Sequence, residues 1–393
     1  MKKNTKLNYY ILYFFVFVSM GGIEKAIAFF FGDFQNGSVY YGLFLSILAF
    51  VEMIMPVLVE RVTSATNYKC VAITYFVIVI IIAAINTLCN SWVGVSLLIF
   101  IIICEARTVF NFSAGNEIIF SIADNEKGGF FARRDLFLYI GIAISLFLSG
   151  AISEKFSPKV AITFLAFMLI IPMVMIQFLK IEQKNVYFKS ETKLFAQALK
   201  LLQHKEFLQL LIISVFSSIY FSCSAYIPFL ALEIGLNYQE IMGAFAGITV
   251  VNAILALFIG DLSDKRNKKV FYIIDLASDI FPCIIFLISQ NVSLFIIAIV
   301  LSSIKDVFAP STFAYKYELI GNFNDDTSKV AIAVLESMTN VMTFFMPLFM
   351  GGVWVVIGKN IFIIAIFSIS ITVLTALFLP PYQSVKNQKV ELK

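Results

Sequence analysis

The run Gly260-Asp261-Leu262-Ser263-Asp264-Lys265-Arg266-Asn267-Lys268-Lys269 lies between two long apolar segments of the chain. Four of its last five residues are cations. A cation at the centre of a membrane helix costs about 2.5–3.5 kcal/mol on insertion scales, so this run has to lie in water. The apolar segments on either side, 240–260 and 270–289, are therefore expected to cross a lipid bilayer.

The whole composition is that of an integral membrane protein. Hydrophobic residues make up 60% of the 393 residues and charged residues 14%, whereas soluble domains contain roughly 25% charged residues. The apolar runs are continuous and do not alternate, which predicts an all-α protein and not a barrel. Twelve segments have the length that a membrane-spanning helix needs. They are 8–31, 39–59, 70–88, 93–118, 136–153, 160–180, 207–232, 240–260, 270–289, 293–314, 330–353 and 360–380.

The distribution of Lys and Arg predicts the orientation of these segments. With the N-terminus on the cytoplasmic side, most of the 29 Lys and Arg residues fall in cytoplasmic loops and tails. The loops expected outside hold only Lys155, Lys159 and Lys359. The protein is therefore predicted to lie in the cell membrane with both termini on the cytoplasmic side. The richness in Lys, Ile, Phe and Asn points to a bacterium.

The longest polar connection divides the chain into two halves. We expect a six-helix bundle over 1–180, a cytoplasmic linker over 181–206, a second six-helix bundle over 207–380 and a cytoplasmic tail over 381–393. Apolar residues at helical spacing between Glu191 and Phe207 predict an amphipathic helix. Such a helix lies on the inner leaflet or binds a partner protein.

The Gly260–Lys269 run resembles the signature loop of the major facilitator superfamily, Gly-x-Leu-x-Asp-Arg-x-Gly-Arg-Lys. Lys265 stands where Arg is usual, and Asn267 where Gly is usual. The residues in register are Gly260, Leu262, Asp264, Lys268 and Lys269. The resemblance implies twelve transmembrane helices in two six-helix halves. It also implies secondary transport by alternating access, and we expect an efflux-type member.

The resemblance further implies that this loop is a cytoplasmic gating clamp. We assign to it Gly260, Asp264, Lys265, Arg266, Lys268 and Lys269. Two embedded acids near cytoplasmic ends, Asp275 and Glu336, are its expected partners. A weaker copy of the motif, Pro56–Arg61, follows the second segment and supports a repeat of the two halves.

Ionisable residues inside membrane segments need a functional or structural reason. The resemblance places the first, fourth, seventh and tenth segments around a central cavity, and Glu52 lies near the middle of the second. Candidate residues for proton coupling or the substrate cavity are Glu24, Glu52, Glu105, Arg107, Lys305 and Asp306. The alternative is that these charges form fixed ion pairs that hold helices together. Asp279 is a further embedded acid without an assigned role.

An embedded carboxyl group can carry a proton because desolvation disfavours its charged form. The expected partners are therefore protons, a small-molecule substrate and the bilayer, with a proton gradient in place of a cofactor. Ser217, Tyr220 and Ser224 share one helix face, which serves either substrate binding or helix packing.

These features favour proton-coupled efflux of a small amphipathic compound, and uptake of a sugar, peptide or metabolite is the alternative. An enzyme is not expected, because the chain has one His and no HExxH motif, Gly-rich nucleotide loop or Ser/His/Asp set. The net charge of +4 is explained by the cytoplasmic loops, so no nucleic-acid partner is expected. The two halves argue against a channel, whereas a membrane sensor stays possible. We expect a monomer.

Overall fold

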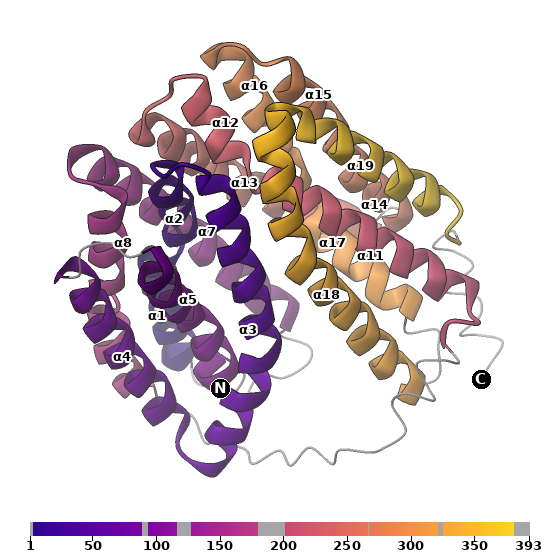
Figure 1. Ribbon diagram of the computed structural model, residues 1–393. Helices are drawn as coiled ribbons and strands as arrows, with labels where there is room; N and C mark the ends of the chain where they lie inside the picture. The colour runs from indigo at the N-terminus through magenta and orange to yellow at the C-terminus, as the bar shows by residue number, and fades with distance from the viewer. Residues whose placement is uncertain are drawn as a thin grey trace. The chain divides into compact units, whose positions relative to one another are not determined.

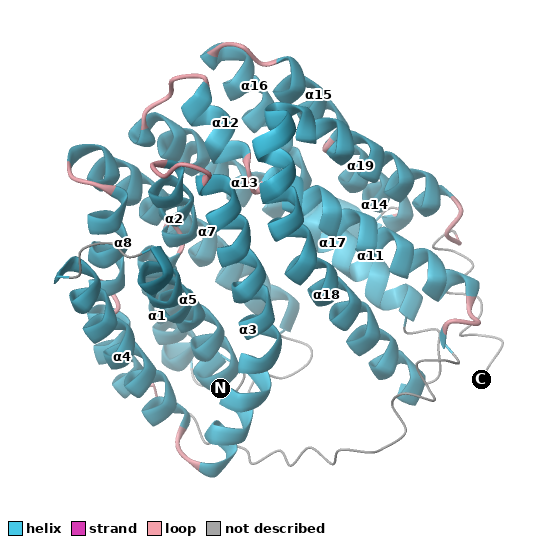
Figure 2. Ribbon diagram, viewed as in Figure 1, coloured by secondary structure: helices cyan, strands magenta, loops and turns pink. Residues whose placement is uncertain are grey.

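The computed structural model describes residues 3–88, 93–115, 127–179, 201–265, 267–320 and 325–380, shown in Figure 1. Within these ranges every regular element is a helix (Figure 2). Contacts divide the chain into two compact units. Unit 1 comprises Met1–Phe188 and Ala231–Ala253, and unit 2 comprises Lys189–Leu230 and Ile254–Lys393.

Unit 1 is a bundle in which α1 packs mainly along α7, and α5 packs against α3 and α4. Long apolar runs form these helices because each backbone group in lipid must be satisfied within its own segment. Its elements are α1 (Lys3–Met20), α2 (Ile23–Gly32), α3 (Gly37–Ala65), α4 (Tyr68–Leu88), α5 (Val93–Phe110), the π-helical turn η1 (Asn111–Gly115), α7 (Lys127–Lys155), α8 (Pro158–Phe167), α9 (Ile170–Met175), η3 (Ile176–Phe178) and the first part of α13 (Tyr238–Lys265).

The first predicted segment is broken into α1 and α2 by a pair of glycines. A Cβ atom on Gly22 would lie 2.7 Å from the carbonyl oxygen of Ser145 in α7, and one on Gly21 would lie 2.8 Å from the Cα atom of Ile142. The Gly22 N–H donates to the Ser145 hydroxyl at 2.8 Å. The absent side chains thus allow close contact with α7, and this contact fixes the start of α2, where Glu24 lies.

The start of α13 belongs to unit 1 because of polar contacts at its N-terminus. Asn237 and Glu240 form a reciprocal capping box, with each side chain accepting from the other's backbone N–H at 2.8 and 3.0 Å. The Tyr238 N–H donates to Glu154 of α7 at 3.0 Å. The Tyr238 hydroxyl donates to Asp33 at 2.7 Å. These bonds hold the first turns of α13 against α7 and the end of α2.

Unit 2 is a second bundle, in which α11 packs along α18 and α19, and α14 packs along α17. The ninth predicted segment is divided into two helices at Asp279, and the tenth is divided near Ser303. The elements are α11 (Lys205–Ser224), α12 (Ile227–Glu233, which reaches into unit 1), the rest of α13, α14 (Lys268–Ser278), α15 (Ile280–Ile288), α16 (Val292–Ser302), α17 (Ile304–Ile320), α18 (Asp325–Ile357), η4 (Gly358–Asn360) and α19 (Ile361–Leu377).

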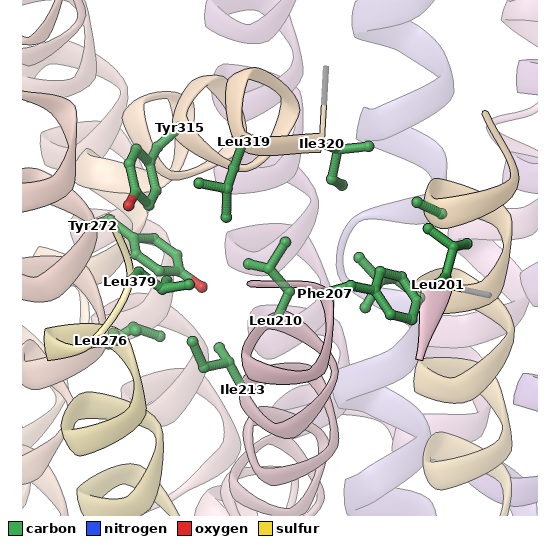
Figure 3. Close-up of a cluster of buried hydrophobic side chains, with 13 residues drawn as sticks. Leu201, Phe207, Leu210, Ile213, Tyr272, Leu276, Tyr315, Leu319, Ile320 and Leu379 are labelled. Atoms are coloured by element: carbon green, nitrogen blue, oxygen red, sulfur yellow. The ribbon is translucent and has the colours of Figure 1, made fainter. Parts of the chain in front are cut away.

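A cluster of buried side chains joins the helices of unit 2 (Figure 3). Phe207 and Leu210 of α11 meet Tyr272 of α14 and Leu319 of α17 in this cluster. Leu201, from the end of the predicted amphipathic linker helix, is fully buried here as well. Residues 191–200 of that helix lie outside the described residues, so its main part stays a prediction.

Ten stretches of the described residues are long and apolar enough to cross a membrane. One of them, Val334–Leu377, runs from within α18 through η4 to the end of α19 and so covers parts of two predicted segments. The α16–α17 pair is not among the ten, and α16 alone has only 11 residues. The all-helical membrane architecture is confirmed, whereas the number of twelve spans stays a prediction.

The two units repeat one structural device at equivalent helix ends. Lys69, at the start of α4, donates to the carbonyl oxygen of Gln177 in η3 at 3.0 Å. Lys269, at the start of α14, donates to the carbonyl oxygens of Leu377 and Leu379 at 2.8 and 2.5 Å. A lysine at this place supplies donors to carbonyl groups that a helix end leaves unpaired, and its charge favours the negative end of the helix dipole.

The same device explains the departure from the family motif at Asn267. The Asn267 side chain accepts from the Lys269 N–H at 3.1 Å and caps α14. Asn67 accepts from the Lys69 N–H at 2.9 Å in the same way. The last residues of α3 and α13 are two hundred positions apart in the sequence, and so are the first residues of α4 and α14. In the structure, Lys69 of unit 1 therefore corresponds to Lys269 of unit 2. Aligning Pro56–Arg61 with the motif gives a different correspondence between the two halves.

Replacing Lys269 by Met is expected to lower the apparent melting temperature of the purified protein. The substitution removes two charge-assisted hydrogen bonds to the end of α19, which contribute about 1–2 kcal/mol together. Lys69→Met should lower the melting temperature less, because one bond is lost. Lys205→Met, at the exposed start of α11, is the matched control. Equal effects of all three substitutions would contradict this role of the lysines.

Candidate functional site

Three predicted site residues meet in one pocket of unit 1. Glu24 comes from the first turn of α2, Glu52 from α3 and Arg107 from the last turn of α5. The cavity has a volume of about 70 Å³, enough for more than one water molecule. Apolar side chains surround the three charged groups. The lining residues are Phe17, Met20, Gly21, Glu24, Leu48, Glu52, Cys104, Arg107 and Ile142.

An ion pair in this pocket joins α3 to α5. One guanidinium nitrogen of Arg107 lies 3.2 Å from a carboxylate oxygen of Glu52. The Arg107 and Glu52 side chains are 45% and 36% exposed, so the pair is open to the pocket and not sealed in the bundle. An open pair of this kind is held weakly. The Arg107 guanidinium can therefore exchange its partner for another anion, and Glu52 for another cation.

Glu105 does not line this pocket, although it lies only two residues from Arg107. Positions two apart face different sides of a helix. Glu105 is buried, with 1% exposure, and it lies in electrostatic contact with Tyr75 of α4. Within unit 1 the Glu105 side chain faces the interior of the bundle. That Glu105 lines a central cavity stays a prediction.

A second ion pair lies in the interior of unit 2. The Lys305 ammonium donates to one carboxylate oxygen of Asp279 at 2.5 Å, and the Tyr220 hydroxyl donates to the other at 2.7 Å. Asp279 is 1% exposed. The Lys305 nitrogen also lies 4.4 Å from the centre of the Tyr220 ring and 4.2 Å from that of Phe221, which adds cation–π attraction.

Helix breaks position this buried pair. Asp279 is the residue between α14 and α15, and it is the N-cap of α15, where the helix dipole favours a negative charge. Lys305 lies in the first turn of α17, directly after the break that separates α17 from α16. The discontinuous helices thus bring two charged groups to the same place. The side chain of the adjacent Asp306 lies outside the described residues.

Asp275 belongs to the same region of unit 2. The Thr312 hydroxyl of α17 donates to one of its carboxylate oxygens at 2.7 Å. The other oxygen has no hydrogen bond within the described part of the chain. Lys305 and Lys316 lie in electrostatic contact with Asp275. Asp275 therefore takes part in the contacts between α14 and α17.

The predicted gating clamp can be followed only in part. Lys268 is buried, and Lys269 caps α19 as described above. Glu336 lies in α18 and is exposed. Arg266, the surroundings of Gly260 and the side chains of Asp264 and Lys265 lie outside what the structure describes. Contacts of this loop with Asp275 and Glu336 stay a prediction.

Asp279 of the buried pair and Tyr220, which donates to it, were not among the predicted site residues. From the sequence, Asp279 is an embedded acid without an assigned role, and Tyr220 is part of a polar face of its helix. The signal that could have joined them is the cost of an isolated charge in lipid. Lys305 requires a carboxylate on another helix, because adjacent positions of a helix face different sides.

Breaking the Lys305–Asp279 pair is expected to destabilise unit 2. Lys305→Met leaves a buried carboxylate without a counter-charge, and a broken buried pair costs about 3–5 kcal/mol. The double variant Lys305→Met/Asp279→Asn removes both charges and keeps an acceptor for Tyr220, so its apparent melting temperature should recover toward the native value. A double variant less stable than Lys305→Met alone would contradict the pairing.

Comparisons with known proteins identify the family and the fold. A sequence model described as Major Facilitator Superfamily matches residues 9–322. No curated protein sequence matches the chain. Among solved structures, the chain is similar to a bacterial homologue of the human lysosomal transporter Spinster, in an inward-facing and unoccupied conformation. The identity is 13%, 96% of this chain and 95% of that chain are covered, and the TM-score is 0.67.

The nucleoside transporter NupG is similar over the whole fold as well. Its structure shares 17% identity, with 96% of this chain and 98% of that chain covered and a TM-score of 0.70. A point mutant of NupG shares 15% identity over 95% and 98% of the two chains, with a TM-score of 0.75. Identities this low show the fold alone, but the family match covers most of the chain. The chain therefore belongs to the major facilitator superfamily, whose members are membrane transporters of small molecules.

Proposed function

We propose that the protein is a secondary active transporter that exports a small amphipathic cation in exchange for protons, by alternating access. The proposal includes twelve transmembrane helices in two six-helix halves, cytoplasmic termini, a place in the cell membrane and a monomeric working unit. The pocket between α2, α3 and α5 is the observation that carries it.

The charge and lining of the pocket support a cationic, partly apolar substrate. Two carboxyl groups, those of Glu24 and Glu52, share the pocket with the single guanidinium of Arg107. When both acids are ionised, the pocket carries one excess negative charge. The apolar part of a ligand would contact Phe17 and the aliphatic lining, and an aromatic ring in the wall of a pocket favours a cation.

The same acids supply a physical route to proton exchange. A carboxylate is neutralised either by a proton or by the positive charge of a bound substrate, because both occupy the same negative oxygen atoms. Alternate occupation by the two, on opposite sides of the membrane, couples proton entry to substrate exit. Glu24 and Glu52 are therefore the first candidates for the groups that exchange substrate and protons.

The export hypothesis predicts that cells producing the protein accumulate less of a fluorescent cation such as ethidium. The difference should be larger in acidic medium, because a steeper inward proton gradient drives more export. Glu24→Gln and Glu52→Gln should each reduce export by about tenfold or more, since a lost charge interaction in a protein is worth more than 1.4 kcal/mol. Glu240→Gln, at an exposed residue of α13, is the matched control and should export normally.

Membrane insertion of each variant is checked by its yield in the membrane fraction and its elution as a single species in detergent. Equal ethidium accumulation with and without the protein, in both media, would count against export of cations. Normal pH-dependent export by both Glu24→Gln and Glu52→Gln would remove these acids from the coupling.

Uptake of a nutrient is the second candidate, and the likeness to the nucleoside transporter NupG favours it. The pocket of unit 1 offers carboxylate acceptors and guanidinium donors that could bind hydroxyl groups. Under this hypothesis, cells producing the protein accumulate a radiolabelled nucleoside. Its internal concentration rises, whereas that of ethidium is unaffected. The two assays together separate the candidates.

A further inference from the structure

Glu105 is a buried acid that the proposed pocket does not use. Its side chain is 1% exposed, and neither of its carboxyl oxygens has a hydrogen bond of good geometry within the described part of the chain. The Thr108 hydroxyl, one turn further along α5, is a polar group in contact with it. An ionised carboxylate in such a place lacks solvent, and the nearest counter-charge, Arg107, is paired with Glu52, which makes the ionised form costly.

Among the described residues of the helices packed against α5, no cation lies beside Glu105 without another partner. α4 contributes Tyr75, whose hydroxyl donates to the carbonyl oxygen of Ile102 at 3.0 Å. α3 contributes Glu52, a like charge. Arg107, on α5 itself, is paired with Glu52. Tyr13 of α1, Glu24 of α2 and Cys104 lie around Arg107, and η1 contains no titratable residue.

The other acids of unit 1 differ from Glu105 in their surroundings. Glu24 lies in the first turn of α2, where the helix dipole favours a negative charge. Glu52 has its guanidinium partner. Glu105 lies five residues before the C-terminal end of α5, where the helix dipole does not favour a negative charge. Of the three, Glu105 is the one for which a neutral carboxylic acid is the favourable form.

The equivalent region of unit 2 shows what unit 1 lacks. The bounds of α4 and of the α14–α15 pair differ by two hundred residues at both ends, so Tyr75 corresponds to Asp275 and Val79 to Asp279. Lys305 lies in contact with both of these aspartates. In unit 1 the position of Asp279 is taken by Val79, which is fully buried. An ionised Glu105 would therefore have no partner like the one that Lys305 has.

We infer that Glu105 is a proton-binding site: it holds a neutral carboxylic acid beside the pocket and releases its proton when the negative charge of the pocket is neutralised. While Glu52 is negative, a second negative charge nearby is disfavoured. A cation bound at Glu52 removes that repulsion, the O–H bond of Glu105 breaks, and the proton passes to water. This step rests on the proposed export function and adds a proton-binding residue to the acids of the pocket.

Infrared difference spectroscopy of the purified protein tests the inference without any transport. Native protein at neutral pH should show the carbonyl band of a protonated carboxylic acid that is absent from Glu105→Gln. Glu240→Gln, which changes an exposed acid, should keep the band. Glu105→Asp keeps a carboxyl group and should show a band at a shifted frequency, which identifies the residue even if Glu105→Gln folds poorly. A native band that Glu105→Gln retains would overturn the inference.

The coupling to the pocket is tested by the pH at which this band disappears. In Glu52→Gln the like charge is gone and Arg107 is released, so the band should disappear at a lower pH than in the native protein. An unchanged titration in Glu52→Gln would overturn the coupling. Because this readout needs no substrate, it separates the two proposals: absence of ethidium export contradicts the proposed function alone, and absence of the band contradicts the proton site alone.

Discussion

A charge inside a membrane helix needs a partner that the surrounding hydrocarbon cannot supply. The two units meet this requirement in different ways. Unit 2 encloses Lys305 with Asp279 and Tyr220, and helix breaks bring the two charged groups together. Unit 1 leaves the Glu52–Arg107 pair open to a pocket. A closed pair holds helices together, whereas an open pair can exchange partners, so the pocket of unit 1 is where we place substrate binding.

The unpaired carbonyl groups at helix ends impose a second requirement, which both units meet with the same residue types. Lys69 and Lys269 reach the last turns of η3 and α19 from the first turns of α4 and α14. Asn67 and Asn267 cap the helices from which the lysines extend. The basic end of the family motif therefore has a structural role within unit 2, separate from the gating role that the family resemblance implies.

Much of the fold and part of the site could be predicted from the sequence. Continuous apolar runs indicated the helices, and the cost of embedded charges singled out Glu24, Glu52, Arg107 and Lys305. The pairing of these charges could not be predicted, because it depends on how helices pack. Lys305 was predicted as a cavity residue or as one member of a fixed ion pair, and its partner in the structure is Asp279, at the break between α14 and α15. The break at Gly21 and Gly22, which positions Glu24, depends on the close approach of α7.

The central claim is that a cation bound in the pocket of unit 1 drives the release of a proton from the embedded acids of that unit. Proton release by the purified protein, measured with a pH indicator in weakly buffered solution while ethidium is added, tests this most directly. Binding is followed in the same sample by ethidium fluorescence. The account predicts that native protein releases protons as ethidium binds and that Glu105→Gln binds ethidium with much smaller release. Saturable binding to the native protein without any change in pH would contradict it.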